Sequence, residues 1–307
     1  MMTARLILTK LLLVFAGLWA GGDAIAQISY STFDDPLGIS TFPAGIFGSE
    51  IVGTYIDVNS NSHGFLFDGN NFSTLDFPNA LGTHPIGVYG NEIVGYYIDA
   101  SIHQHGFLYD GTTFSTLDYP GTTGGGANGV WGNSIVGSYT DAGGVGHGYI
   151  YDGSNFTSLS YPDPDTRRTS ANGISGTRIV GSYEDSHGTH GFLSNGNSWT
   201  AFSVPFALQT NATSISGNNI VGFFENTQSQ IHGFLFNGTT YTTLDYPGAT
   251  LTEATGISGN VIVGSYSTGG HAHGFIATIP EPQELSLITA AGSFLLGFAV
   301  RRRRRQF

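Results

Sequence analysis

A short piece of sequence, His-Gly followed by large apolar residues, returns six times and constrains the fold of this chain more than any other feature. The histidines that begin these pieces are His63, His105, His147, His190, His232 and His273. The steps between them are 42, 42, 43, 42 and 41 residues. A near-constant period of this size indicates repeated supersecondary units, each of which needs its neighbours to bury an apolar face.

Each unit carries four strand-like pieces. The first, as at 114–120, is rich in β-branched and aromatic residues and ends at proline. The second, as at 171–175, is made of small residues, the third contains Ile-Val-Gly, and the fourth is the His-Gly piece. Asp-Gly or Asn-Gly dipeptides after the fourth piece predict hairpins, and nothing between residues 27 and 279 has helical periodicity.

Four short antiparallel strands in about 42 residues match a propeller blade in size. We therefore predict an all-β fold, a six-bladed β-propeller over residues 27–279, with the small second piece nearest the axis. Five complete copies of the first piece each follow a His-Gly piece. The sixth copy, 30–36, precedes all the repeats, and none follows the last His-Gly piece. This offset predicts that the N-terminal strand completes the last blade and closes the ring. An open β-solenoid is the competing architecture, and it gives no reason for the offset.

The two ends of the chain have the composition of processing segments. Residues 1–26 have the pattern of a signal peptide, with an apolar run at 11–20. Ala24 and Ala26 form the small-residue cleavage site, and cleavage is expected before Gln27. A membrane anchor is the alternative, but that run is too short to span a bilayer. Residues 280–307 begin with Pro280, Glu281 and Pro282 and continue into an apolar stretch at 285–300, which predicts a transmembrane helix of about 24 Å.

Five arginines follow that stretch at once and are expected to stay on the cytoplasmic side. They are Arg301, Arg302, Arg303, Arg304 and Arg305. The order of proline-glutamate-proline, apolar helix and arginine block resembles the PEP-CTERM sorting signal of Gram-negative bacteria. The resemblance implies a substrate of exosortase that signal peptidase also processes. It further implies export, an inner-membrane intermediate held by the C-terminal helix, and then a cell-surface or extracellular location.

The repeats themselves resemble the HAF family of predicted extracellular repeats. The resemblance rests on the His-Gly-Phe-Leu pieces and the Ile-Val-Gly strands, and this chain has glycine where that family usually has alanine after the histidine. It implies an extracellular location and a repeat architecture. It implies no biochemical activity, because the family carries none that is agreed.

Charge and cysteine content exclude several classes of function. Residues 27–279 hold three arginines, no lysine and 19 carboxylates, a formal charge of −16. Nucleic acid and anionic membrane surfaces are poor partners for such a domain, because both need clustered basic side chains. The chain has no cysteine, which excludes disulfides and zinc-thiolate sites. We expect no cofactor.

The repeated histidines suggest a metal site, but six copies on a wide ring cannot supply three or four ligands to one zinc ion. We expect instead that a ring nitrogen of each histidine bonds a neighbouring strand. Asp57, Asn59 and Asn61 resemble the start of a calcium loop, but no glutamate closes it. We interpret this segment as a solvated turn, with a weak calcium site as the alternative.

Catalysis needs a constellation that is not repeated. The polar residues outside the repeat pattern are His84, His103, His187, His271, Asp163, Asp165, Arg167 and Arg168. The segment 163–168 is an insertion, which we interpret as a salt-bridged surface loop. We therefore predict a non-enzymatic surface or matrix protein. The alternative is an extracellular propeller hydrolase acting on a polysaccharide or ester, with Asp163, Asp165 and His187 as its acid–base candidates.

Two further patterns bear on binding. The residue before the inner turn is aromatic in three copies, Phe47, Tyr89 and Trp131, and serine in the other three, Ser175, Ser216 and Ser258. This asymmetry predicts packing between blades or, alternatively, an aromatic platform for sugar near the axis. The links that vary in sequence, from third to fourth piece and between blades, are expected on one face, a second candidate surface. An extracellular polysaccharide is the candidate partner, either neutral or bridged by calcium if acidic, and a cationic surface is the alternative.

Overall fold

The computed structural model describes residues 27–122 and 124–280, and in this part of the chain all regular structure is β-strand. The expected segments at 1–26 and 281–307, which include Ala24, Ala26, Glu281, Pro282 and the arginine block, lie outside the described residues. Of the predicted motif residues, Gln27 and Pro280 are described, and both lie outside the strands. No helix in the described part is long and apolar enough to span a bilayer.

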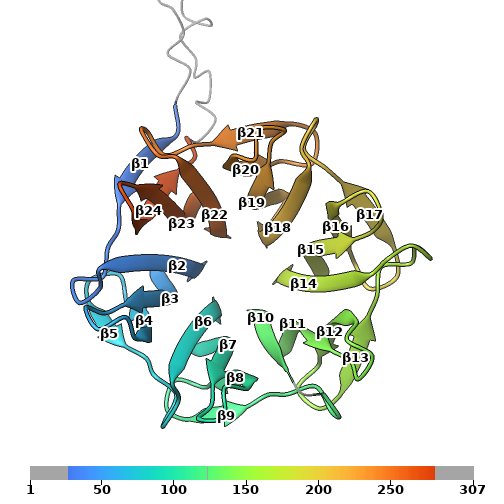
Figure 1. The fold of residues 1–307 in the computed structure, drawn as a ribbon, viewed down its shortest axis with the longest axis horizontal. Helices are drawn as coiled ribbons and strands as arrows, with labels where there is room; N and C mark the ends of the chain where they lie inside the picture. The colour runs from blue at the N-terminus through green and yellow to red at the C-terminus, as the bar shows by residue number, and fades with distance from the viewer. Residues whose placement is uncertain (1–26, 123, 281–307) are drawn as a thin grey trace, which may run out of the picture.

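Twenty-four strands form six four-stranded blades around an axis, as Figure 1 shows. Blades 1, 2 and 3 contain β2 (Ser40–Phe47), β3 (Glu50–Ile56), β4 (Ser62–Phe67) and β5 (Phe72–Thr74); β6 (Gly82–Tyr89), β7 (Glu92–Ile98), β8 (Gln104–Tyr109) and β9 (Phe114–Thr116); β10 (Gly125–Trp131), β11 (Ser134–Thr140), β12 (Gly146–Tyr151) and β13 (Phe156–Leu159).

Blades 4, 5 and 6 contain β14 (Arg168–Ser175), β15 (Arg178–Glu184), β16 (Thr189–Ser194) and β17 (Trp199–Phe202); β18 (Gln209–Ser216), β19 (Asn219–Glu225), β20 (Ile231–Phe236) and β21 (Tyr241–Leu244); β22 (Leu251–Ser258), β23 (Val261–Thr268), β24 (His271–Thr278) and β1 (Ser29–Thr32). In blades 1 to 5 the inner, second, third and outer strands follow in chain order. The small second piece of each repeat lies nearest the axis, as the sequence predicts (Figure 1).

The N-terminal strand β1 belongs to the sheet of the last blade. It pairs antiparallel with β24, from Ser29 opposite Thr278 to Thr32 opposite Phe275. Asp34 then accepts hydrogen bonds from the Gly274 amide (3.0 Å) and the His273 ring (2.9 Å), as the matching aspartate does in other blades. The sixth copy of the first piece therefore occupies the outer position of blade 6.

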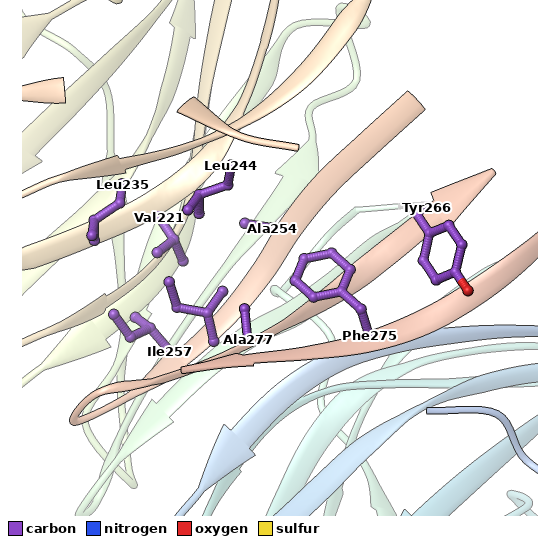
Figure 2. Packing of buried hydrophobic residues seen from close by; sticks show 9 residues of the cluster. Val221, Leu235, Leu244, Ala254, Ile257, Tyr266, Phe275 and Ala277 are labelled. Atoms are coloured by element: carbon purple, nitrogen blue, oxygen red, sulfur yellow. The ribbon is translucent and has the colours of Figure 1, made fainter. Parts of the chain in front are cut away.

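The core consists of six clusters, and each joins two consecutive blades. In the cluster of Figure 2, Val221 and Leu235 of blade 5 meet Ile257 and Phe275 of blade 6. Between blades 6 and 1, Val263 of β23 and Phe33, which follows β1, pack with residues of blade 1 such as Phe65. Because both faces of each blade are covered in this way, the strands have apolar runs and not the alternation of a half-exposed sheet.

Third-strand aromatic rings lie over the glycine of each Ile-Val-Gly piece. A Cβ added at Gly137 would overlap the carbonyl oxygen of Gly126 and lie 2.5 Å from the Tyr149 ring. The same holds at Gly181, where the ring belongs to Phe192. The glycine is thus required by the closeness of the inner-strand carbonyl and of the aromatic ring beside it.

The inner strands approach one another closely around the axis. Each carries a β-bulge, and the bulged residue of four blades donates a hydrogen bond to the next blade's inner strand. These bonds run from Asn128 to Ala171 O (2.9 Å), Asn172 to Ala212 O (2.8 Å), Thr213 to Ala254 O (2.8 Å) and Thr255 to Pro43 O (2.7 Å). The last of them joins blade 6 to blade 1.

Deleting residues 28–36 tests how much stability the N-terminal strand supplies. The deletion removes the β1–β24 pairing and the side chain of Phe33, which is 7% exposed. Loss of a buried phenylalanine alone costs about 3–5 kcal/mol, so we expect the melting temperature to fall by roughly 10 °C or more. Thermal unfolding followed by circular dichroism measures this. Phe206→Ala, at a 93% exposed phenylalanine, is the control and should melt like the parent protein.

Candidate ligand site at the channel mouth and the histidine ring

The two faces of the propeller differ in the connections they carry. One face, here called the loop face, carries the second-to-third-strand loops and the links between blades. The two sets adjoin there, because the Leu81 amide donates to Ile98 O (2.8 Å) and the Arg167 amide to Glu184 O (2.7 Å). The opposite face, the turn face, carries the two-residue inner turns and the Asp-Gly or Asn-Gly turns. The predicted grouping of variable loops on one face is confirmed.

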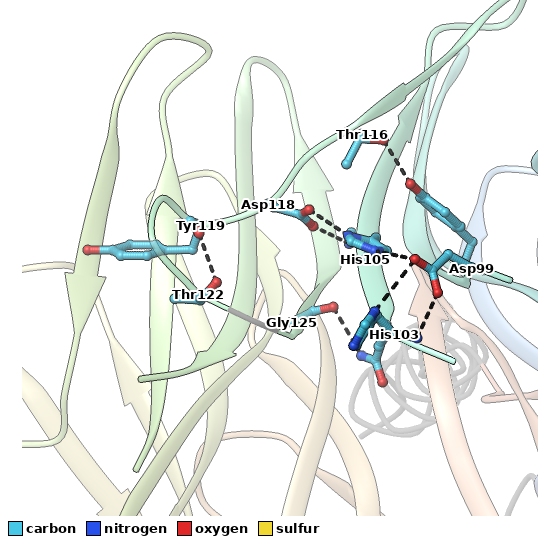
Figure 3. A network of polar contacts seen from close by, with 11 residues as sticks. Asp99, His103, His105, Thr116, Asp118, Tyr119, Thr122 and Gly125 are labelled. Carbon is cyan, nitrogen blue, oxygen red and sulfur yellow. Dashed lines mark hydrogen bonds and ion pairs between the residues drawn. The ribbon is translucent and has the colours of Figure 1, made fainter. Parts of the chain in front are cut away.

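The six repeated histidines lie at the loop-face end of the third strands. Figure 3 shows His105, whose Nδ1 lies 2.7 Å from Asp118 and whose Nε2 lies 3.4 Å from Asp99. The same aspartate accepts the Gly106 amide (2.9 Å), and the imidazole stacks on Tyr97 at 5.2 Å. Each histidine therefore ties the third strand to the segment after the outer strand, which confirms the structural role predicted for it.

The partner of the histidine differs between blades. Through Nδ1, His63, His105, His232 and His273 bond an aspartate, whereas His147 bonds Ser160 (3.0 Å) and His190 bonds Ser203 (2.9 Å). Through Nε2, His147 also bonds Asp141 (3.0 Å). Hydrogen bonding to Asp118 raises the pKa of His105, and hydrogen bonding to Asp76 raises the pKa of His63. No group of three or more His, Cys, Asp or Glu side chains in residues 27–122 and 124–280 could hold a metal ion.

The calcium-like segment forms a turn with its side chains bonded to one another. Asp57 accepts the backbone amides of Asn59 and Asn61, both at 2.8 Å. The Asn61 amide nitrogen also donates to Asp57 (3.1 Å), and these bonds lower the pKa of Asp57 to about 2. The carboxylate is thus occupied by internal donors, as expected for a solvated turn.

The remaining non-repeated residues do not converge. His84 is half-buried, with Nδ1 3.2 Å from the Thr54 hydroxyl and its ring stacked on Tyr96 at 4.5 Å, and burial lowers its pKa. His103 and His187 are exposed and lie 3.7 and 3.6 Å from Asp99 and Asp185. His271 begins β24 on the surface.

The insertion 163–168 is stabilised by its own turn bonds. The Asp165 amide donates to the Asp163 carboxylate (2.9 Å), and the Thr166 amide donates to Asp163 O (3.0 Å). Among the residues that the structure describes, no ion pair involves Arg167 or Arg168, so our interpretation of this loop as salt-bridged is wrong. The same set contains no bond from His187 to Asp163 or Asp165.

The aromatic half of the inner turns forms a continuous arc, here called the aromatic arc, of Phe47, Tyr89 and Trp131. Its ring centroids are 4.6 Å apart between Phe47 and Tyr89 and 4.8 Å between Tyr89 and Trp131. All three rings line an axial cavity of about 160 Å³ that reaches the turn face. Trp131 is 38% exposed, so the arc both packs between blades and presents an aromatic surface.

Two of the three serines, Ser216 and Ser258, face the same cavity with hydroxyl groups, whereas Ser175 does not line it. Each of the two accepts a backbone amide of an adjacent inner turn. The Gly259 amide donates to Ser216 (3.0 Å) and the Gly48 amide donates to Ser258 (3.2 Å). Each hydroxyl keeps a proton to donate. The mouth therefore combines aromatic faces on one side with hydroxyl groups on the other.

Replacing the aspartate beside one histidine tests the cause of the shifted pKa. Asp118→Ser gives repeat 2 the partner found in repeats 3 and 4, and the pKa of His105 should fall towards its ordinary value of about 6.5. Nuclear magnetic resonance titration of the imidazole measures it. Asp110→Ser removes a carboxylate that bonds only its own turn, Thr112 and Thr113, and should leave His105 unchanged.

The sign of the stability effect follows from the raised pKa. Stability supplied by the His105–Asp118 bond is fully present below the unfolded pKa of about 6.5 and is lost as pH rises through the folded pKa. The parent protein should therefore lose more stability than Asp118→Ser between about pH 6 and pH 8. An unchanged His105 pKa in the serine variant would contradict this explanation.

No protein-family model matches the chain, and no curated protein matches it. Among solved structures, it resembles a sialidase of Trypanosoma rangeli, with a TM-score of 0.51 and 11% identity over 89% of this chain and 59% of that one. It also resembles the β-propeller domain of the trilobed protease of Pyrococcus furiosus, with a TM-score of 0.50 and 8% identity over 79% of this chain and 94% of that one. A third similar structure is a six-bladed propeller lectin of Aleuria aurantia, with a TM-score of 0.48 and 15% identity over 80% of this chain and 98% of that one. The chain spans about three fifths of the sialidase. At these identities the likeness shows the fold alone, a β-propeller.

Proposed function

We propose that this protein is a non-enzymatic, exported surface or matrix protein whose propeller binds a neutral glycan at the mouth of its axial channel. The aromatic arc carries this proposal, because Phe47, Tyr89 and Trp131 line a cavity open to solvent beside the hydroxyl groups of Ser216 and Ser258. Aromatic faces stack on the apolar faces of sugar rings, and hydroxyl groups orient them by hydrogen bonds. The charge of −16 over residues 27–279 favours a neutral partner over a polyanion.

The proposed address rests on the ends of the chain. We propose that the signal peptide directs export and that an exosortase recognises the tail. The two ends of the described chain lie on the same face of the propeller. Strand β24 ends at Thr278 opposite Ser29, and the Ile279 amide donates to Asn260 O (2.8 Å) in an inner turn. Both ends therefore leave from the turn face. A tail held in the inner membrane would direct the loop face away from it.

We also propose that β1 closes the ring energetically as well as geometrically, since a closed ring has no free sheet edge to template aggregation. The alternative of a propeller hydrolase needs an observation beyond the fold. Propellers host both binding and catalysis, so the fold does not decide between them. The decisive observation would be a converged acid–base pair, and no bond in the described residues brings His187 to Asp163 or Asp165.

Replacing Trp131 tests the glycan site. Trp131→Ala removes the exposed end of the aromatic arc and should weaken binding of a neutral glycan by about tenfold or more, because a central aromatic contact is worth over about 1.4 kcal/mol. Trp131→Phe keeps a stacking face and should retain most of the affinity. A glycan array identifies the ligand, and titration calorimetry measures the variants. The proposal would be contradicted if no neutral glycan on the array bound the protein, or if Trp131→Ala bound the glycan as tightly as the parent protein.

Mass spectrometry of the mature protein tests the address. In a Gram-negative host with an exosortase, the surface-located protein should begin at Gln27 and end near residues 280–282. A chain that lacks residues 281–307 should fold normally but leave the cell without anchoring, which separates sorting from folding. Surface-located protein that retains the block from Arg301 to Arg305 would refute recognition by exosortase.

A further inference from the structure

The six blade boundaries can be compared at one layer near the loop face. There, a residue of each second strand opposes a residue of the next inner strand, as Thr54 opposes His84 at 3.2 Å. By repeat equivalence, the six pairs are Thr54 and His84, Tyr96 and Gly126, Ser138 and Ser170, Ser182 and Asn211, Phe223 and Glu253, and Ser265 and Phe42. Four pairs include an aromatic or imidazole ring. The two pairs that flank β14 contain only small polar side chains.

Cavities lie at these two boundaries. One, of about 370 Å³ between blades 3 and 4, is lined by both Ser138 and Ser170. The other, of about 450 Å³ between blades 4 and 5, is lined by Ser182 and Asn211. We call these two cavities the β14 grooves. They exist where the repeat lacks the ring that occupies the other boundaries, so they reflect a departure of the sequence from its own pattern.

One cationic side chain borders both β14 grooves. Arg168 begins β14 and lines each of them. It is the only charged residue at this position of the inner strand, where the other blades have Ser40, Gly82, Gly124, Gln209 and Leu251. Its side chain lies over Gly146, since a Cβ added there would be 2.9 Å from Cγ and Nε of Arg168.

Three polar side chains that line the grooves are unused within the protein, whereas the Ser170 hydroxyl donates to Asn172 (2.7 Å). Over residues 27–122 and 124–280, the side chains of Arg168, Gln209 and Asn211 make no hydrogen bond or ion pair. Glu184 lies opposite Arg168 across the strand pair and lines the second groove, yet no ion pair joins the two. An arginine that has no partner in so acidic a domain is a preformed site for a carboxylate, which guanidinium binds in a bidentate manner.

We propose that the β14 grooves bind a sugar acid, a pyranose with a single carboxylate. Arg168, which borders both grooves, receives the carboxylate. In the groove between blades 4 and 5, Gln209 and Asn211 donate to the sugar hydroxyl groups, and the Ser170 oxygen accepts from one. A single carboxylate fits one guanidinium, whereas a polyanion or phosphate dianion is repelled by the charge of −16. This site is on the loop face, away from the aromatic arc, so the inference goes beyond the proposed neutral-glycan site and does not depend on it.

Titration of the purified protein with galacturonate tests the proposal. Galactose and the methyl ester of galacturonate match its shape without the charge and should bind at least about tenfold more weakly. Arg168→Gln should reduce galacturonate affinity by a similar factor. Arg167→Gln is the matched control, because it removes the same charge from the same loop but lines neither groove. Trp131→Ala should leave this binding unchanged, which separates the two sites.

The repeat itself supplies variants that fill the grooves. Ser138→Tyr and Ser182→Tyr introduce the residue that blade 2 has at the equivalent position, Tyr96, so the fold should accept them. At least one should abolish galacturonate binding while the melting temperature holds. The proposal would be overturned if the parent protein did not bind galacturonate, or if Arg167→Gln and Arg168→Gln lost equal affinity. It would also be overturned if both tyrosine variants still bound galacturonate, or if inorganic phosphate bound equally well.

Discussion

The close approach of six inner strands around the axis is the constraint on which the rest of the structure depends. In five of the six blades the residue after the bulge is glycine, because the backbones of consecutive blades approach too closely there for a side chain. A Cβ added at Gly45 would overlap the carbonyl of Ile86, and one at Gly173 would lie 2.9 Å from the Cα of Ser214. Asn128, Asn172, Thr213 and Thr255 then bridge four boundaries by hydrogen bonds to the next backbone. Small residues in the inner strand are thus a requirement of ring geometry.

That constraint separates residues that maintain the ring from residues that are free to differ. The repeated histidines, the Ile-Val-Gly glycines and the third-strand aromatics recur because every blade must contact two others in the same way. We therefore expect function where the copies diverge. The aromatic arc occupies half of the turn-face mouth, and the β14 grooves occupy two of six boundaries on the loop face. Because they lie on different faces and are proposed to bind a neutral and an acidic sugar, one propeller would contact two kinds of sugar.

Much of the fold could be predicted from the sequence, because a fixed period, hairpin dipeptides and an offset first piece each limit the arrangement of strands. The role of His105 followed from geometry alone, since a wide ring cannot share one zinc ion. The salt-bridged interpretation of 163–168 was wrong because the presence of opposite charges in a loop does not determine their distances. The β14 grooves were missed, since Ser138 and Ser182 are unremarkable by themselves. Alignment with Tyr96 and Phe223 shows that Ser138 and Ser182 stand where other blades have aromatic rings. That difference matters only because these positions oppose the next inner strand, which the sequence does not show.

The central claim is that ligands bind where the repeats differ and not at their shared residues. A crystal structure of the protein soaked with a neutral oligosaccharide and galacturonate together tests it most directly. We predict density for the neutral sugar beside Trp131 at the turn-face mouth and for galacturonate beside Arg168 in the β14 grooves. Sugar density repeated at all six equivalent positions beside His63, His105 and their counterparts would contradict the claim.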